Sequence, residues 1–476
     1  MNIKTSFILL LLVVFSQAIS AQNNDKHRTI ILTDIEADPD DTQSLIRLLL
    51  YSNQIDIKGI IATTSTHLRN SIHPQSIKRI IENYRKIYPN LSLHESGYPL
   101  ADNLINLVKS GSPVYGMSGV GKGKDTEGSD WIIKILEEKD ERPLYISVWG
   151  GTNTLAQALH KIKAQKSKAE AERLISKIRI YAISDQDDSG IWIRNKFPEL
   201  FYIVSPGKYE RSTWLAINQV VQNGINNEVI SNKWIADNIQ QGHGPLGASY
   251  PDVMWGMEGD TPAFLWLIPN GINAPEHPDW GSWGGRYELY QPEFIADEGA
   301  GGVRTEPETR PIWTNAKDQY TPTVYNAFGR TLKKLHEATL KDNRATILRW
   351  REDFQNDFAA RIDWTVKPYE EANHPPVPVL AHEDILTLKS GQWFTLDATG
   401  TYDPDGDHLS YLWFSYPEAG SYKEPIIKEI ENSHRANIAI PKVNQPETAH
   451  IILKVTDHGQ PHLSRYKRII INIIPQ

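Results

Sequence analysis

Five carboxylates lie within eight residues near the start of the chain, in Asp34-Ile-Glu36-Ala-Asp38-Pro-Asp40-Asp41. Such a density of like charges is costly unless a cation or protons neutralise it. Carboxylate oxygens prefer hard cations, so Ca²⁺ or Mg²⁺ is the expected guest. The spacing does not fit an EF-hand loop. A plainer interpretation stays open, because Asp40 and Asp41 would also stabilise the N-terminus of a helix.

The segments around this loop predict an α/β fold. Buried strands are predicted by apolar, β-branched runs at residues 29–33, 56–62, 144–149, 178–183 and 200–204. Apolar residues at helical spacing follow at residues 40–51, 76–87 and 153–163. This alternation predicts a mostly parallel sheet with helices on both faces. Ligands bind such sheets at the carboxyl ends of the strands, which is where the acidic loop lies.

The second half of the chain changes character. An apolar stripe of Ile347, Trp350, Phe354, Phe358 and Ile362 has helical spacing and predicts core packing. Residues 365–378 have the composition of a linker. Short alternating strands and turns in residues 379–476 predict an antiparallel β-sandwich.

The first 21 residues have the features of a secretory signal peptide. Lys4 precedes the apolar run at residues 7–15, and small residues at 17–21 offer a cleavage site. A membrane anchor is the alternative, but the run is about half of the roughly 20 residues that span a bilayer. We therefore expect export to the periplasm or the extracellular space, with the signal removed.

Composition excludes several classes of function. The chain has 476 residues, a formal net charge of −8 and no cysteine. The absence of cysteine excludes disulfides, thiolate metal sites and cysteine nucleophiles. A mildly acidic balance gives no electrostatic footprint for nucleic acid.

Four stretches carry a resemblance to a known family. Residues 33–45 (TDIEADPDDTQSL) resemble the opening of nucleoside hydrolases, and more closely that of a secreted bacterial nucleoside hydrolase-like group often labelled cellulose-binding. Residues 148–156 (VWGGTNTLA), 193–195 (IRN) and 258–265 (EGDTPAFL) are similar to further motifs of that family. The resemblance covers residues 28–364. Residues 397–413 (DATGTYDPDGDHLSYLW) resemble a PKD-like or cadherin-like Ig module, as is typical of the same group.

The resemblance implies roles for the acidic loop. Glu36, Asp41 and Asp260 would bind a metal ion, with the backbone carbonyl of Trp149 completing its shell. The ion would be Ca²⁺, with Mg²⁺ as the second choice. Asp40 would hold a sugar hydroxyl, and Glu36 would accept a proton from the attacking water.

Two further substrate contacts follow from the same comparison. Asp34 would support the loop or contact the ligand, and Asn195 would hold a sugar hydroxyl. The leaving-group histidine of the family is Gly259 here. Glu258 and His243 are the candidates to replace it, although a lone histidine is more often structural.

Aromatic residues and an arginine in the loop-rich segment 242–308 offer a carbohydrate surface. Trp280 and Trp283 either stack on sugar rings or pack their loop down. Arg286 could pair with the carboxylate of a uronate. In the sandwich, Asp403, Asp405 and Asp407 form either a structural turn or a peripheral Ca²⁺ site.

Three functions remain open from the sequence. The first is a secreted, metal-dependent glycoside hydrolase that cleaves a plant-polysaccharide fragment or furanoside. The second is a non-catalytic carbohydrate-binding protein, and the third is a periplasmic nucleoside hydrolase. Nucleoside hydrolases commonly associate, so a homo-oligomer is compatible with each.

Overall fold

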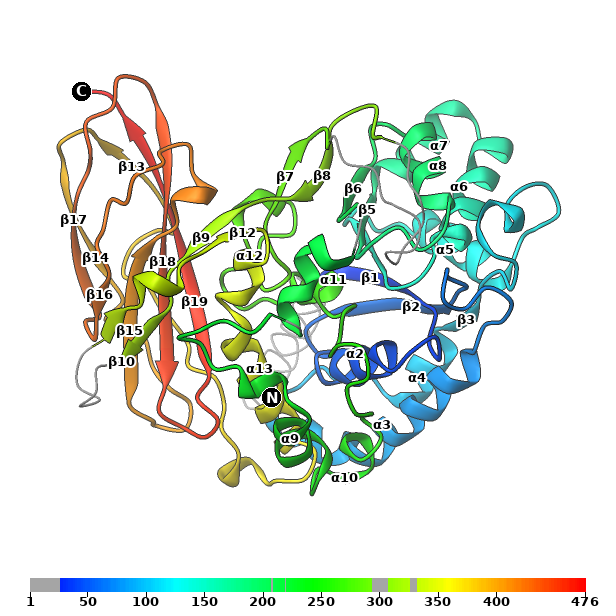
Figure 1. Cartoon of the computed structure of the whole chain (residues 1–476), viewed down its shortest axis with the longest axis horizontal. Helices are drawn as coiled ribbons and strands as arrows, with labels where there is room; N and C mark the ends of the chain where they lie inside the picture. Colours follow the sequence, from blue (N-terminus) through cyan, green and yellow to red (C-terminus); the bar gives the residue numbers. More distant parts are fainter. Residues whose placement is uncertain (1–25, 207–208, 219, 293–306, 326–331) are drawn as a thin grey trace, which may run out of the picture.

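The structure is a computed structural model, and it describes residues 26–206, 209–218, 220–292, 307–325 and 332–476. Two parts lie side by side: a large α/β part and a smaller β-sandwich (Figure 1). Among the described residues, no helix is long and apolar enough to cross a bilayer. The expected signal peptide lies outside the described residues.

An eight-stranded sheet forms the centre of the first part, in the order β3-β2-β1-β4-β5-β6-β8-β7. All neighbouring pairs are parallel except β7 and β8. The strands are β1 (Arg28–Thr33), β2 (Asp56–Ala62), β3 (Val108–Ser110), β4 (Leu144–Val148), β5 (Ile178–Ala182), β6 (Phe201–Val204), β7 (Tyr287–Tyr290) and β8 (Ile312–Asn315).

Helices cover both faces of this sheet because side chains alternate along each buried strand. On β1, Ile31 packs with the apolar residues of α2, α3 and α13, while Ile30 and Leu32 pack with those of α5 to α8. The helices are α2 (Asp40–Leu50), α3 (Pro74–His94), α4 (Ala101–Asn106), α5 (Glu127–Glu137), α6 (Asn153–Gln165), α7 (Lys168–Ser176), α8 (Ser189–Lys196), α9 (Asn232–Ile235), α10 (Gly244–Gly247), α11 (Pro262–Leu265), α12 (Ala345–Leu348) and α13 (Arg351–Asp363).

The predicted α/β class is confirmed, and the five expected strands agree with β1, β2, β4, β5 and β6 to within one residue at each end. The strand order reverses at β1, which has β2 on one side and β4 on the other. Ligands of open α/β sheets bind at such a switch point. The acidic loop follows β1 directly, so the fold places it there.

The predicted β-sandwich is also confirmed. One sheet has the order β13-β19-β18-β15-β16, and the other pairs β14 with β17. The buried Trp413 and the isoleucines of β18 and β19 fill the space between them. The strands are β13 (Ile385–Lys389), β14 (Trp393–Asp397), β15 (Leu409–Ser415), β16 (Ile430–Glu431), β17 (Arg435–Ala439), β18 (Glu447–Asp457) and β19 (Ser464–Ile474).

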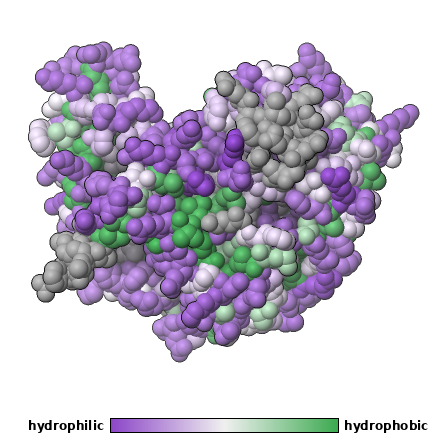
Figure 2. All heavy atoms as spheres, viewed as in Figure 1, coloured by the Kyte–Doolittle hydropathy of each residue, from purple (hydrophilic) through white to green (hydrophobic). Residues whose placement is uncertain are grey.

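The two parts share an apolar interface built on α12 and α13. The predicted stripe is fully buried there, and Trp350 meets Tyr466 of β19 edge-on at 5.4 Å. Figure 2 shows hydrophobic side chains gathered in the middle of this face, between the two parts, and mostly hydrophilic ones elsewhere on it. Two short antiparallel strand pairs border the interface, β9 (Asp318–Tyr320) with β12 (Leu340–Asp342) and β10 (Thr323–Tyr325) with β11 (Leu332–Lys334).

Candidate functional site

A cavity of about 580 Å³ opens at the carboxyl ends of the parallel strands. Its walls come from the loops after β1, β2, β4, β5 and β6 and from the loop before α11. Five of its lining residues are aspartates, and its other polar or aromatic residues are His67, Trp149, Gln186, Tyr209, Glu210, Trp214, Asn218 and Trp255. We call this cavity the acidic pocket.

The aspartates of the acidic pocket converge from two distant segments. Asp38, Asp40 and Asp41 each offer an oxygen within 4.8 Å of the others, a spacing that suits a metal ion. Asp260, which lines the same pocket, comes from a loop more than 200 residues later. Asp34 completes the group at the end of β1.

These carboxylates interact with one another electrostatically. Burial raises the pKa of Asp41 well above its ordinary value, and the charge of Asp34 raises it further. Burial likewise raises the pKa of Asp260, with the charges of Asp40 and Asp41 adding to the effect. Ionising these carboxylates together is therefore costly, and a bound cation would relieve that cost.

Local hydrogen bonds hold the loop in place. The backbone N–H of Ile35 donates to Thr33 Oγ1 at 3.1 Å, and Thr33 Oγ1 also donates to Asp41. Asp38 accepts from the N–H of Asp40 at 3.2 Å, just where α2 begins. Across the sheet edge, a Cβ on Gly150 would lie 2.5 Å from Asp34 Oδ1. Glycine at this position therefore allows the carboxylate to approach β4.

Several buried polar atoms of the pocket have no hydrogen-bond partner among the described residues. They are Asp260 Oδ2, Gln186 Oε1, Asn218 Oδ1 and Trp214 Nε1. Leaving such atoms unsatisfied is costly, so they indicate a ligand. Three of the four are oxygens beside clustered carboxylates, which is the donor set that Ca²⁺ and Mg²⁺ prefer. The residues present therefore fit a hard divalent cation.

Glu36, the residue expected to bind metal and accept a proton, lies outside this cluster. Its backbone has a φ of 80°, and its side chain turns toward α3. There it pairs with Arg79 at 2.9 Å and His73 at 3.3 Å, and Ser76 donates to it. Asp38 occupies the place in the acidic group that the sequence assigned to Glu36.

Trp149 lies where expected, beside the pocket at the end of β4. Its carbonyl oxygen accepts a hydrogen bond from Gln186 Nε2 at 2.5 Å. The unpartnered Gln186 Oε1 belongs to the same amide group. Trp149 and Gln186 together thus offer two oxygens at this edge, one of which already has a donor.

The two candidates for the missing leaving-group acid are both tied to other partners. Glu258 is fully buried, pairs with Arg47 at 2.7 Å and accepts from Tyr250 and Thr261. His243 lies 2.9 Å from Asp363 in a different part of the fold. Neither side chain lines the pocket. Their contacts are therefore those of structural residues, with Glu258 beside the loop that carries Asp260 and His243 away from the pocket.

Gly259 explains why the family histidine has no equivalent here. A Cβ at this position would lie 2.9 Å from Asp40 Oδ2 and 3.2 Å from Trp214. Asp40 and the Trp214 ring occupy the space that a side chain would need. The departure noted in the sequence is thus matched by its surroundings.

The remaining predicted sugar contacts are placed elsewhere. Asn195 is exposed on α8, while its buried neighbour Arg194 pairs with Asp185 and Glu308. Each of the other three lies in the interface with the sandwich, where its partners are protein groups. Trp280 stacks on His277 at 3.8 Å, Trp283 donates to Tyr466 at 3.3 Å, and Arg286 binds Asp318 at 2.6 Å.

Sequence reasoning missed the aromatic and histidine residues of the pocket. His67 follows β2, and its Nε2 lies 3.0 Å from the hydroxyl of Tyr209. Tyr209 meets Trp214 edge-on at 5.6 Å, and Trp255 is 74% exposed at the pocket. All follow strands or lie in the loop-rich segment. For those that follow a strand, the position after a predicted parallel strand was the only available signal.

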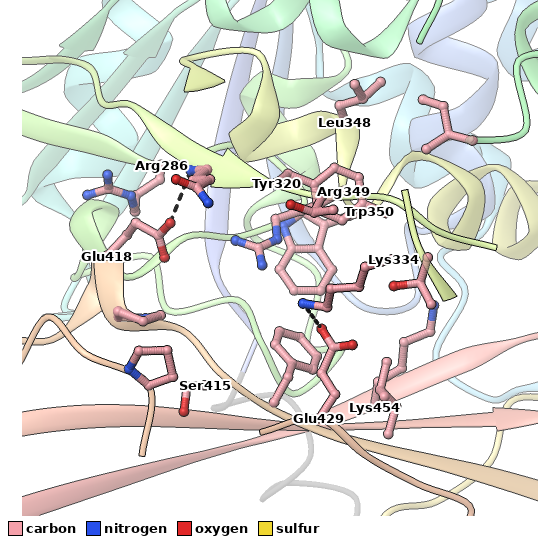
Figure 3. Close-up of a pocket in the computed structure, with 18 of the residues that line it drawn as sticks. Arg286, Tyr320, Lys334, Leu348, Arg349, Trp350, Ser415, Glu418, Glu429 and Lys454 are labelled. Atoms are coloured by element: carbon pink, nitrogen blue, oxygen red, sulfur yellow. Dashed lines mark hydrogen bonds and ion pairs between the residues drawn. The ribbon is translucent and has the colours of Figure 1, made fainter. Parts of the chain in front are cut away.

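A larger cavity of about 840 Å³ lies between the two parts of the molecule, and we call it the interdomain pocket. It is also rich in charge, but several of its charges are paired. Lys334 pairs with Glu429 at 2.8 Å (Figure 3). Lys454 pairs with Asp353 at 2.5 Å. Arg349 lies over the Tyr416 ring at 4.3 Å and pairs with Asp318. This cavity has the features of a polar interface rather than of a reaction site.

A mostly parallel sheet with clustered carboxylates at its switch point defines a nucleoside hydrolase-like protein. The chain belongs to the cellulose-binding Sde182 family, whose nucleoside hydrolase-like domain matches residues 28–287. The C-terminal domain of cellulose-binding protein Sde0182 matches residues 393–473. No curated protein matches the chain.

A solved structure agrees with this assignment. A nucleoside hydrolase-related hypothetical protein from Saccharophagus degradans, described as associated with carbohydrate metabolism, is 34% identical. The match covers 94% of this chain and 100% of that one, with a TM-score of 0.77. The effector XOO4466 and the type III effector XopQ, complexed with adenosine diphosphate ribose, are each 10% identical over 74% of this chain. Those matches cover 98% and 99% of the effectors, and their TM-scores of 0.36 and 0.37 carry no argument.

Proposed function

We propose that the chain is an exported, cation-dependent glycoside hydrolase that acts on a neutral carbohydrate. The observation that carries this proposal is the convergence of Asp34, Asp38, Asp40, Asp41 and Asp260 on one pocket at the switch point of the sheet. The family is labelled cellulose-binding, which supports a carbohydrate as the ligand.

The charge of the pocket argues for the class of sugar. Among the described residues, its lining includes six carboxylates and His67, but neither lysine nor arginine. A divalent cation would neutralise only two of these charges. Phosphorylated sugars and uronates would therefore be repelled, and neutral sugars favoured. The placement of Arg286 outside the pocket removes the earlier argument for a uronate.

Asp41 and Asp260 would hold the cation, together with oxygens of Gln186 and Trp149. When bound, a divalent cation orients sugar hydroxyls and lowers the pKa of the attacking water. Asp40 would accept a hydrogen bond from a sugar hydroxyl. Trp214, with its unpartnered Nε1, and the exposed Trp255 would flank the sugar ring.

Proton transfers would fall to two residues at the open side of the pocket. Asp38 is less buried than Asp41 or Asp260 and would accept the proton that water loses on attacking the anomeric carbon. His67, positioned by Tyr209, would donate a proton to the departing glycosidic oxygen. The aspartates would stabilise the positive charge of the oxocarbenium-like transition state.

The test is hydrolysis of a panel of neutral glycosides, uronides and nucleosides with and without EDTA. We expect turnover of a neutral glycoside that EDTA and Asp41→Asn abolish, and that His67→Gln lowers by about 100-fold or more. Glu36→Gln is the matched control and should retain activity. Turnover that survives both EDTA and Asp41→Asn would discard the cation mechanism.

A second candidate, a non-catalytic carbohydrate-binding protein, is favoured by a specific observation. Glu36 is turned away, and Gly259 leaves no room for the family histidine. Binding of soluble cellulose fragments that Trp255→Ala weakens, without turnover of any substrate, would establish this alternative. Release of free base from inosine or uridine would instead identify a nucleoside hydrolase.

A further inference from the structure

A second group of carboxylates lies where the linker enters the β-sandwich. Asp403, Asp405 and Asp407 each offer an oxygen within 4.8 Å of the others. Asp403 Oδ1 accepts from the backbone N–H groups of Asp405 and Asp407 at 2.9 and 3.1 Å. These bonds alone describe an ordinary acidic turn.

A buried carboxylate outside this turn argues that the turn is more than a structural feature. Asp457 ends β18 and is only 1% exposed. It is paired across the sheet with Leu409, two residues beyond Asp407. Its Oδ1 accepts from the N–H groups of Gly459 and Leu463 at 3.1 and 2.9 Å. Its Oδ2 has no hydrogen-bond partner among the described residues.

Asp457 and Asp403 belong to one electrostatic group. Burial raises the pKa of Asp457 to about 6, and the charge of Asp403 contributes to that rise. Asp403 Oδ2 is likewise buried without a partner in the described part of the chain. Asp457 and Asp403 thus each have one unsatisfied carboxylate oxygen, and no ion pair with a cationic side chain involves either of them among the described residues. A hard cation would satisfy both.

The linker is bound to the same group from two adjacent residues. Asn373 Nδ2 donates to Asp457 Oδ1 at 3.1 Å, and the N–H of His374 donates to Asp405 Oδ2 at 2.7 Å. The His374 ring stacks on Tyr369 at 3.9 Å and contacts His94 of α3 at 3.0 Å. The acidic corner is therefore tied directly to the α/β part.

We propose that Asp403, Asp405, Asp407 and Asp457 form a Ca²⁺ site that fixes the linker to the sandwich. Ca²⁺ takes six to eight oxygen ligands with flexible geometry, which four carboxylates and water can supply. Binding would hold the acidic turn against the end of β18 and keep Asn373 and His374 in place. The site is separate from the acidic pocket and needs none of its residues.

The test is equilibrium dialysis of the full chain with ⁴⁵Ca²⁺ at millimolar concentration. Asp457→Asn keeps the Oδ1 acceptor but removes the charge, and we expect it to lose one bound Ca²⁺ per chain. Asp403→Asn should lose the same one and serves as the second variant if Asp457→Asn does not fold. Asp384→Asn, an exposed aspartate of the same domain, is the matched control.

A second readout follows the linker itself. Ca²⁺ should slow proteolytic cleavage within residues 365–378 in the wild type and in Asp260→Asn, but not in Asp403→Asn. Asp260→Asn tests the acidic pocket independently, so failure of one site leaves the other distinguishable. The proposal is overturned if both sandwich variants bind as much Ca²⁺ as Asp384→Asn and their linkers are still protected by it.

Discussion

The acidic pocket and the interdomain pocket both concentrate charge, but they balance it differently. In the interdomain pocket, Arg286, Lys334, Arg349 and Lys454 each have a carboxylate within 3.2 Å. In the acidic pocket, the aspartates lie together, and burial with mutual repulsion raises the pKa values of Asp40, Asp41 and Asp260. In the larger cavity, these four charges are therefore balanced by protein carboxylates, whereas the aspartates of the acidic pocket have no such counter-ions in its described lining.

This difference shows that charges without counter-ions indicate a ligand-binding site better than the volume of a cavity does. Paired charges at an interface stabilise it and need nothing more, whereas like charges without counter-ions are kept at a cost in stability. Trp280, Trp283 and Arg286 looked suited to a sugar in the sequence, yet the fold uses all three to join the two domains.

The largest effect should come from breaking an ion pair of the interdomain pocket. Arg286→Ala leaves buried Asp318 with fewer partners, so we expect a loss of about 3–5 kcal/mol in the free energy of unfolding. Urea unfolding measures it. Arg79→Ala, which breaks the exposed pair with Glu36, should cost less than about 1 kcal/mol. Equal losses in the two variants would contradict the contrast.

Removing a charge from the acidic pocket should instead raise the stability of the cation-free protein. Asp260→Asn relieves repulsion, so its cation-free form should unfold at a higher temperature than that of the wild type. Its affinity for Ca²⁺ should fall by at least about 100-fold. Calorimetric titration and thermal unfolding with EDTA check both, and Glu36→Gln should change neither.

A pH effect should arise at the interface between the domains. Burial and the adjacent charge of Arg468 lower the pKa of His450 to about 3. Below pH 6.5 the unfolded chain binds a proton at this histidine that the folded chain does not, so stability falls as the pH falls. The contribution between pH 7 and 5 is about 2 kcal/mol.

Urea unfolding at several pH values tests this contribution. His450→Gln should flatten the slope between pH 7 and 5, and His382→Gln in the same domain should not. The assignment to His450 fails if both variants keep the slope of the wild type.

The smallest effect concerns the aromatic rim of the acidic pocket. Trp255→Ala should weaken carbohydrate binding by about 0.5–1.5 kcal/mol and raise KM or Kd roughly three- to tenfold. Trp393, 72% exposed on the sandwich, is the matched control. Affinity lost only in Trp393→Ala would move the glycan surface to the C-terminal domain.

Much of the fold could be predicted because its signals are local. Apolar runs such as residues 29–33 and 56–62 identify buried strands, and the stripe on α13 identifies a core face. The short strands β3 and β8 were missed, since three or four residues carry too little periodicity. The acidic loop could be placed at the sheet edge for the same local reason.

Local sequence signals could not predict every residue that belongs to the site. The resemblance selected Glu36 and gave Asp38 no role, but the backbone turn at Glu36 sends its carboxylate to α3 and leaves Asp38 in the pocket. His67 and Trp214 belong to loops without any motif, so no pattern could have selected them.

The sequence by itself thus determined the α/β sheet, the sandwich and the carboxylates that begin the acidic pocket, because hydrophobic periodicity and charge density act over a few residues. The tertiary structure decided which other side chains meet, such as His67 with the aspartates of the acidic pocket and Asp457 with the turn at Asp403. Those meetings depend on strand order and on the direction of each side chain, which arise only when distant segments pack together.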